Sequence, residues 1–472
     1  MSQVTSRPGR PPQPPPAAPR QVVPAPAPGG AASTPGGTSA ERRAQAEAAV
    51  RTFFEGSPGR LRLVGVGAVL ACLVFALLGA AAFQARAGAL ADASADAAQL
   101  IRVQQIATEV VKADSLLTNA FPTPDAETAD QVGQFNAALS RASRLVVAAA
   151  AANPADGPKL AQVSDALGQY GQYATNARSF NKDGKQVALG YLRQAGAALR
   201  GQDTNNPNLI TGAGMLPALN DLIKASTDRV DGAYTASNWA TVEMIAADLV
   251  ALAGLVLVQV WLARRTRRYL NLPLVVATAG VLVVLVVGAF VMAGAQSRAN
   301  DVRATSYTAL RSLAEARIAA NAAKSDASIS FLYLRTGGSF ATYKSDYDAK
   351  VLQVGQSLQR AGSAAPSDST TDFVTWRKAA DTIFTTDFTT RPDDWIKAAN
   401  AMAKVDEPFN KPFLALDDAL AQKIDAEADK VGTGLDDGRA PIVVLGWVAL
   451  VVGLLAAVGS WAGIAQRLED YR

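Results

Sequence analysis

The sequence contains no histidine and only one cysteine, Cys72, among its 472 residues. The lack of histidine excludes histidine-based catalysis and zinc sites built from cysteine and histidine. A single cysteine excludes intrachain disulfides, and the position of Cys72 inside an apolar run predicts a small buried residue rather than a reactive thiol. A Walker A sequence, a glycine-rich phosphate loop and a kinase signature are also missing. We therefore expect a protein that is not an enzyme and that needs neither a metal nor a cofactor.

Long apolar runs are the most prominent feature that is present. Apolar residues make up 49% of the chain, and the mean hydropathy is +0.10. A helix needs about 20 consecutive apolar residues to cross a bilayer. Four runs satisfy this length, at 63–85, 243–263, 274–295 and 442–465. The sequence thus predicts four transmembrane helices, and the long stretch before Leu63 argues against a cleavable signal peptide.

The distribution of charge orients these helices. The segment 1–62 holds eight Lys/Arg and three Asp/Glu, and the turn 264–273 holds four arginines and no acid. The long segments 86–242 and 296–441 are slightly acidic, with 13 basic against 14 acidic residues and 18 against 20. Short segments rich in arginine stay in the cytoplasm. We expect a multi-pass protein of the cell (plasma) membrane whose two termini, including the stub 466–472, and whose turn face the cytosol.

The composition along the chain predicts its organisation and an all-α fold. Residues 1–40 are rich in Pro, Ala and Gly and predict a disordered tail, and 41–62 predict a juxtamembrane helix. In 86–242 apolar residues recur at helical spacing. Turn-forming sequences interrupt the two long segments at 121–128, 153–159, 181–185, 203–208, 335–339, 362–370, 389–394 and 407–412. Each long segment is therefore expected to form an extracytoplasmic up-down helical bundle.

The two halves also match in sequence at a constant offset of 212 residues. Lys112 and Asp114 correspond to Lys324 and Asp326, at equal distances from the preceding span; Gln84 and Arg86 likewise correspond to Gln296 and Arg298. The coincidences predict a tandem duplication of span, outer bundle and span. The four Lys and Asp residues are candidate contacts for a ligand or partner, and the alternatives are an exposed charge pair or an internal polar tie.

Four arginines, Arg264, Arg265, Arg267 and Arg268, lie in the turn between the second and third predicted spans. Nucleic-acid binding is not expected, because no basic domain accompanies them and the spans leave room only for a tight turn. The arginines fix the orientation of the two spans and draw the turn toward anionic lipid. A second hypothesis makes them a docking site for a cytosolic partner.

The layout of the chain resembles a known family. Four spans, two outer domains similar to the four-helix sensor domains of chemoreceptors, the RRTRRYLN turn and the repeated Lys-x-Asp resemble the GlnX-type membrane proteins of actinobacteria. The resemblance implies that the outer bundles contact an extracytoplasmic glutamine-binding lipoprotein. It also implies that the arginine turn and the N-terminal tail face cytosolic protein kinase G.

Most of the polar mass is predicted to lie outside the membrane, which favours sensing or protein binding over transport. We expect a transmembrane sensor or signal relay whose outer bundles recognise an amino-acid-binding protein or a small ligand. The alternative is a structural or scaffold protein of the cell envelope, and a transporter subunit is a third possibility. The expected partners are the membrane, a solute-binding protein and a kinase, and the sequence leaves a homo-oligomer open.

Overall fold

The computed structural model describes residues 57–122, 127–182, 186–201, 214–266, 272–336, 340–386 and 392–469. The chain divides into two units, Met1–Arg60 and Leu61–Arg472, and the second unit holds nearly all of the described residues. Every regular element in the described ranges is helical, as the all-α prediction requires. The predicted tail, 1–40, and most of the predicted juxtamembrane helix, 41–62, lie outside the described residues.

The first half of the chain begins and ends with a long helix and has three shorter helices between them. Its described elements are α2 (Ser57–Ala120), α3 (Ala129–Ala152), the 3-10 turn η2 (Pro154–Asp156), α4 (Gly157–Lys182), α5 (Val187–Arg200) and α6 (Met215–Thr266). The second predicted span, 243–263, lies within α6.

The second half shows the same order of elements. Its described elements are α7 (Leu272–Val302), the π-helical turn η3 (Arg303–Tyr307), α8 (Thr308–Thr336), α9 (Phe340–Ala361), the 3-10 turn η4 (Gly362–Ala364), α10 (Ser369–Thr385), α11 (Pro392–Ala403) and α12 (Asn410–Glu469). One difference is that a π-helical turn separates α7 from α8, whereas α2 runs through the corresponding position as regular α-helix. The same order of elements in the two halves agrees with a tandem duplication. The duplication itself stays a prediction.

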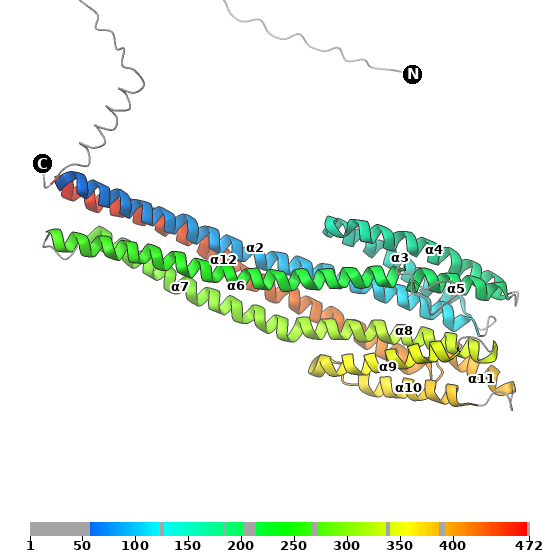
Figure 1. Cartoon of the computed structure of the whole chain (residues 1–472). Helices are drawn as coiled ribbons and strands as arrows, with labels where there is room; N and C mark the ends of the chain where they lie inside the picture. Colours follow the sequence, from blue (N-terminus) through cyan, green and yellow to red (C-terminus); the bar gives the residue numbers. More distant parts are fainter. Residues whose placement is uncertain are drawn as a thin grey trace, which may run out of the picture. The chain divides into compact units, whose positions relative to one another are not determined.

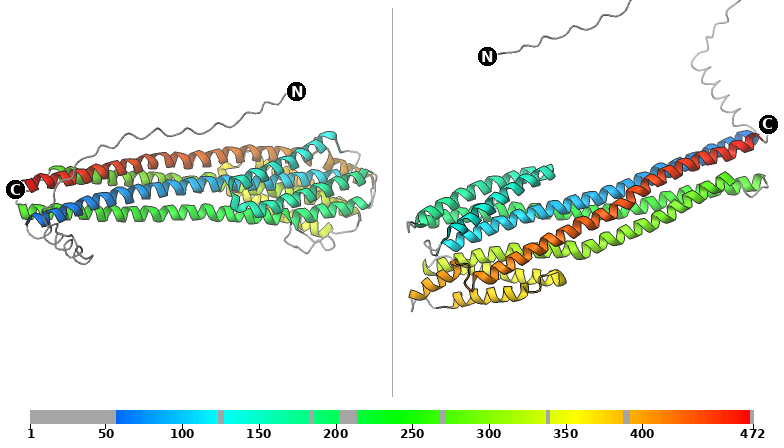
Figure 2. Two further views of the ribbon diagram at one scale, coloured as in Figure 1. Left: turned by 90° about the horizontal axis from the view of Figure 1, so that it is seen from above. Right: turned by 180° about the vertical axis from the view of Figure 1, so that it is seen from behind.

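The shorter helices gather at one end of the long ones. In both figures α3, α4 and α5 lie on one side of the long helices, and α9, α10 and α11 lie on the other (Figures 1 and 2). Helix α4 packs on α5 and α6, whereas α9 packs on α8 and α10 packs on α12. Beyond these helices, α2, α6, α7 and α12 continue together as a four-helix stalk.

Local sequence explains where the helices end. Each predicted break coincides with a gap between two described helices. At the start of α3 the Thr128 hydroxyl accepts from the backbone N–H of Gln131 at 3.2 Å, and the Gln131 side chain accepts from the backbone N–H of Thr128 at 2.8 Å. This capping box satisfies two N–H groups that the first helical turn leaves unpaired. Asn153 ends α3 and its side chain caps the turn η2 that follows.

Three of the long helices are long and apolar enough to cross a membrane: Leu63–Ala120, Leu272–Tyr333 and Asn410–Gly463. In the apolar runs of these helices, large side chains such as Leu77, Phe290 and Leu455 are more than half exposed. Such exposure is unfavourable in water and is what a lipid environment accommodates. These features identify a membrane protein. These three are the candidates among the described residues, and α6 is not one of them, so the fourth span stays a prediction.

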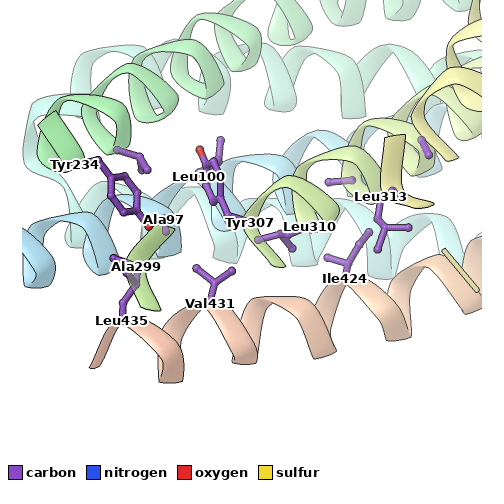
Figure 3. Close-up of a cluster of buried hydrophobic side chains, with 14 of the residues drawn as sticks. Ala97, Leu100, Tyr234, Ala299, Tyr307, Leu310, Leu313, Ile424, Val431 and Leu435 are labelled. Atoms are coloured by element: carbon purple, nitrogen blue, oxygen red, sulfur yellow. The ribbon is translucent and has the colours of Figure 1, made fainter. Parts of the chain in front are cut away.

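The four long helices meet around one apolar core, shown in Figure 3. Its labelled side chains come from every long helix: Ala97 and Leu100 of α2, Tyr234 of α6, Ala299 of α7, Tyr307 of η3, Leu310 and Leu313 of α8, and Ile424, Val431 and Leu435 of α12. All of them are buried. Burial of apolar side chains at helical spacing therefore holds the stalk together where it joins the shorter helices.

Close approach joins α2 to α12 nearer the other end of the stalk. A Cβ atom placed on Gly453 of α12 would lie 2.5 Å from Ala76 Cβ and 2.8 Å from Ala76 Cα of α2. Only glycine permits this distance between the two backbones. A polar contact also connects the halves here, because the buried Arg86 guanidinium of α2 donates to Gln296 Oε1 of α7.

Candidate functional site

The four candidate Lys and Asp residues lie in one seam between α2 and α8. Asp114 and Asp326 are each 1% exposed, Lys324 is 4% exposed, and the Lys112 side chain is 27% exposed. Polar side chains join the two helices directly, since Ser325 Oγ of α8 donates to Asp114 Oδ2 of α2. The structure thus brings together residues that are 212 positions apart and places three of the four away from solvent.

Asp114 and Asp326 share one arginine, Arg200, at the end of α5. Its Nη2 atom lies 2.8 Å from Asp114 Oδ2 and 3.5 Å from Asp326 Oδ1. The same nitrogen donates to Ser325 Oγ at 3.0 Å. Gly201 follows with a φ of 69° in the left-handed region, and its N–H donates to Ala197 O at 2.8 Å. Glycine adopts this conformation readily, so the chain leaves α5 immediately after Arg200 has reached the seam.

Two further side chains complete what we call the Asp114 cluster: Asp114, Tyr170, Arg200, Ser325, Asp326 and Lys350. Tyr170 of α4 donates its hydroxyl to Asp114 Oδ1 at 3.2 Å, and Lys350 of α9 donates to Asp326 Oδ2. The cluster therefore holds two carboxylates, one guanidinium and one ammonium, so its formal charges balance. Balanced pairing is the condition under which buried charges are tolerated.

Burial and pairing oppose one another in this cluster. Burial raises the pKa of Asp326, and the neighbouring Lys350 and Arg200 act to lower it. For Arg200, burial acts to lower the pKa, but Asp114 and Asp326 raise it above its ordinary value. Burial and the adjacent Asp114 carboxylate raise the pKa of Tyr170. Tyr170 is therefore neutral and donates a hydrogen bond to Asp114, while Arg200 is charged.

A second group, the Asp417 cluster, lies on the α12 side of the seam and contains Lys112, Arg317, Asn321, Lys324 and Asp417. Arg317 of α8 donates two hydrogen bonds to the Asp417 carboxylate, from Nε at 2.8 Å and from Nη2 at 3.0 Å. Asn321 Nδ2 donates to the same carboxylate at 2.8 Å, and Lys112 Nζ lies 3.4 Å away. Burial acts to raise the pKa of Asp417, but Arg317 and the other donors lower it to about 2.

Lys324 is the group that the Asp417 cluster accommodates least well. Its ammonium lies 4.3 Å from the centroid of the Phe413 ring of α12, a cation–π distance. Burial lowers the pKa of Lys324; Asp417 acts to raise it, Lys112 acts to lower it, and the result is a pKa of about 7. With Arg317 and Lys112 already on Asp417, the cluster has three basic groups for one buried carboxylate. With a pKa of about 7, Lys324 changes between its charged and neutral forms near neutral pH.

Several members of these clusters were not among the candidates named from the sequence: Tyr170, Arg200, Arg317, Asn321, Lys350 and Asp417. The offset of 212 does not lead to them, because the residues opposite Arg317 and Lys350 in the first half are Gln105 and Ala138. Helical spacing does supply a signal within α8. Arg317, Asn321 and Lys324 stand at i, i+4 and i+7 and form one polar stripe on an alanine-rich helix.

The candidate arginines of the turn fall only partly within the described residues. Arg264 and Arg265 belong to the last turn of α6, where the side chain of Arg264 is exposed. Arg267 and Arg268 lie outside the described residues.

Comparison with known proteins supports a sensor. Residues 89–235 match the family model of an actinobacterial sensor domain. The matched range begins in α2, covers α3, α4 and α5, and ends in α6, so it contains Lys112, Asp114 and Arg200. The chain matches no curated protein and no solved structure. The family match supports an actinobacterial sensor protein. The helical fold and the three helices that are long and apolar enough to cross a membrane agree with a sensor held in a membrane.

Proposed function

We propose that this chain is a non-enzymatic transmembrane sensor or signal relay. In this proposal the outer helical bundles recognise a small ligand or an amino-acid-binding protein, and the resulting state is passed to a cytosolic partner such as a Ser/Thr kinase. The match of residues 89–235 to a sensor-domain family supports the sensing role. The kinase and the binding protein are suggested by the resemblance to GlnX-type proteins.

One observation carries the proposal: the long helices continue from the apolar runs into the bundles. Helix α2 spans 64 residues and α12 spans 60 residues, and α7 passes into α8 through a single π-helical turn. A helix rises about 1.5 Å per residue, so each of α2 and α12 extends about 90 Å or more. Rigid elements of this kind transmit small shifts, rotations or tilts from one end to the other.

The membrane topology in this proposal has four spans and two extracytoplasmic bundles that arose by duplication. The parallel order of elements in the two halves supports the duplication. Helix α6 is continuous through 243–263, which supports a second span between the first bundle and the turn. Both termini and the turn then face the cytosol, where the arginines would be available to a partner and to anionic lipid.

Partner capture tests the relay. The tagged full-length chain is cross-linked in native membranes with and without added amino acids, and its partners are identified. A relay requires at least one partner on either side of the membrane whose yield changes with amino acids, because a ligand acts only through a difference in affinity for two states. A set of partners that is identical in both conditions would instead favour the scaffold alternative.

Charge-conserving substitution tests the docking hypothesis for the turn. Replacing Arg264, Arg265, Arg267 and Arg268 with lysine preserves the positive charge that sets topology, but it removes the planar, bidentate contacts of guanidinium. Loss of a cytosolic partner with unchanged topology would support specific recognition. Unchanged partner binding would leave the arginines with the anchoring role alone.

A scaffold remains the second candidate, and the buried clusters are the observation that favours it. The Asp114 cluster ties α2 to α8 through Arg200 of α5, and the Asp417 cluster ties α2 and α8 to α12. A protein that only holds envelope components in place benefits from such ties. The amino-acid dependence of partner capture separates the two functions.

A further inference from the structure

A groove lies between α9 and α10 in the second half. Its volume is about 370 Å³, which suits a small organic molecule. The lining residues used below are Tyr347, Asp348, Gly355, Phe373, Arg377 and Asp381. Aromatic rings form its floor, since Tyr347 and Phe373 are 1% and 7% exposed. Charged side chains stand around them.

The hydroxyl of Tyr347 is a buried polar group that lacks a hydrogen-bond partner among the described residues. Buried hydroxyls are normally paired, and one that is not calls for an explanation. Burial raises the pKa of Tyr347, and the carboxylates of Asp381 and Asp348 raise it further. The phenol therefore keeps its proton and stays neutral, so the negative charge beside the Tyr347 ring comes from the two carboxylates.

The charges beside this hydroxyl favour an ammonium group. Asp381 has one ion pair among the described residues, to Arg377, and that contact is long at 3.6 Å. Its carboxylate thus retains acceptor capacity. The chain already places an ammonium of its own at the edge of this region: Lys344 Nζ lies 2.6 Å from Asp348 Oδ1 and 5.4 Å from the centroid of the Tyr347 ring. Carboxylates and aromatic faces together are the usual surroundings of an ammonium ion.

The corresponding helices of the first half lack these groups. At the offset of 212, Phe135 replaces Tyr347, Asn136 replaces Asp348 and Gln169 replaces Asp381. Ser143 stands in place of Gly355. Both carboxylates, the phenol hydroxyl and the glycine that leaves room in the groove therefore belong to the second half alone. A purely structural repeat gives no reason for this difference.

The groove is also adjacent to the buried clusters through α9. Tyr347 and Lys350 stand three residues apart on this helix, and Lys350 holds Asp326. A molecule bound in the groove therefore contacts α9, the helix that supplies Lys350 to the Asp114 cluster.

We propose that the groove between α9 and α10 binds a small organic ammonium ion with an apolar body. The ammonium pairs with Asp381 and lies beside the neutral Tyr347 ring, and the body packs on Phe373 and Val351. This assignment gives the proposed sensor its ligand class; its signalling consequence rests on the proposed function, whereas binding itself does not.

Binding is tested by calorimetry on the full-length chain in lipid nanodiscs with 2-phenylethylammonium as the probe. We expect saturable binding in the micromolar to millimolar range, and about tenfold or weaker binding for Asp381→Asn. Gly355→Leu, which fills the groove without changing charge, should abolish binding. Asp165→Asn, which alters an exposed carboxylate on α4 of the first half, should leave binding unchanged. The neutral analogue 2-phenylethanol should bind at least about tenfold more weakly than the ammonium probe.

Three outcomes would overturn the inference. The first is the absence of saturable binding of the probe to a chain whose thermal unfolding is normal. The second is equal binding of the ammonium probe and the alcohol, and the third is unchanged binding of the probe by Asp381→Asn. The proposed function fails separately: probe binding without any change in partner capture would contradict the relay and leave the groove assignment standing.

Discussion

Replacing Lys324 with methionine should make the protein more stable at neutral and acidic pH. Methionine keeps the length and the apolar stem of the side chain and removes the ammonium, which sits in a site that is 4% exposed. Burial lowers the pKa of Lys324 from 10.5 to about 7. At about 1.4 kcal/mol per pKa unit, keeping the charge in this site costs up to about 5 kcal/mol. Asp417 retains Arg317 and Asn321 in the variant, so no buried carboxylate is left unpaired.

The same lysine predicts how stability depends on pH. Between about pH 7 and 10 the unfolded chain holds a proton on Lys324 that the folded protein has released. Stability therefore rises with pH across this window, because the unfolded state binds more protons there. Below pH 7 both states are protonated, and the full cost of the buried charge is present. The Lys324→Met variant should lose this rise.

Thermal unfolding of the full-length chain in nanodiscs, followed by circular dichroism between pH 6 and 9, measures both effects. Lys112→Met is the matched control: the Lys112 side chain is 27% exposed and pairs with Asp417 at 3.4 Å. It should lower stability slightly and keep a rise of stability with pH. Because Lys112 acts to lower the pKa of Lys324, the rise should begin at a higher pH than in the parent. The reasoning is refuted if Lys324→Met is less stable than the parent at pH 6, or if the parent shows no rise above pH 7.

Three further substitutions test other parts of the structure. Arg200→Gln leaves two buried carboxylates without their shared guanidinium and should cost about 3–5 kcal/mol in unfolding free energy, the usual effect of breaking a buried ion pair; a loss below about 1 kcal/mol would contradict this. Thr128→Ala removes the capping hydroxyl of α3 and should cost about 1 kcal/mol, seen as faster hydrogen exchange in its first turn. Gly453→Val forces α12 away from Ala76 and should cost about 1–3 kcal/mol, whereas the control Gly432→Val, at a position with open space, should have little effect on packing.

The helix ends could be predicted from the sequence because they depend on local chemistry. The capping residues Thr128 and Asn153 and the proline- and glycine-rich breaks act within one or two turns of the chain. The three helices that can cross a membrane were predictable for a similar reason, since apolar length alone decides them. The π-helical turn at Arg303–Tyr307 was not predictable, because the offset between the halves is the same on both sides of it.

The site was predictable only in part. Repetition pointed to Lys112, Asp114 and their counterparts, which the structure brings into one seam. It did not point to their partners, because Arg200 and Asp417 come from helices that are far away in sequence and have no charged match in the other half: the residues at the offset are Pro412 and Asn205. Contacts between helices set such pairings, and a single sequence does not show them. Among the alternatives weighed from the sequence, the geometry corresponds most closely to an internal polar tie.

The distribution of these ties shows which long helices are bound most strongly to one another. The two buried clusters join α2, α8 and α12, and separating any of them unpairs a buried charge at a cost of about 3–5 kcal/mol. A ligand shifts a conformational equilibrium only by its difference in affinity, and a hundredfold difference supplies about 2.7 kcal/mol. Helix α6 is held differently: its ion pairs to other long helices, Arg229–Asp96 and Arg303–Asp231, are partly exposed and each contributes about 1 kcal/mol or less. In its ion pairs α6 is therefore tied to its neighbours more weakly than α2, α8 and α12 are tied to one another. Its buried apolar side chains, such as Leu222, Val230 and Tyr234, supply the rest of its packing.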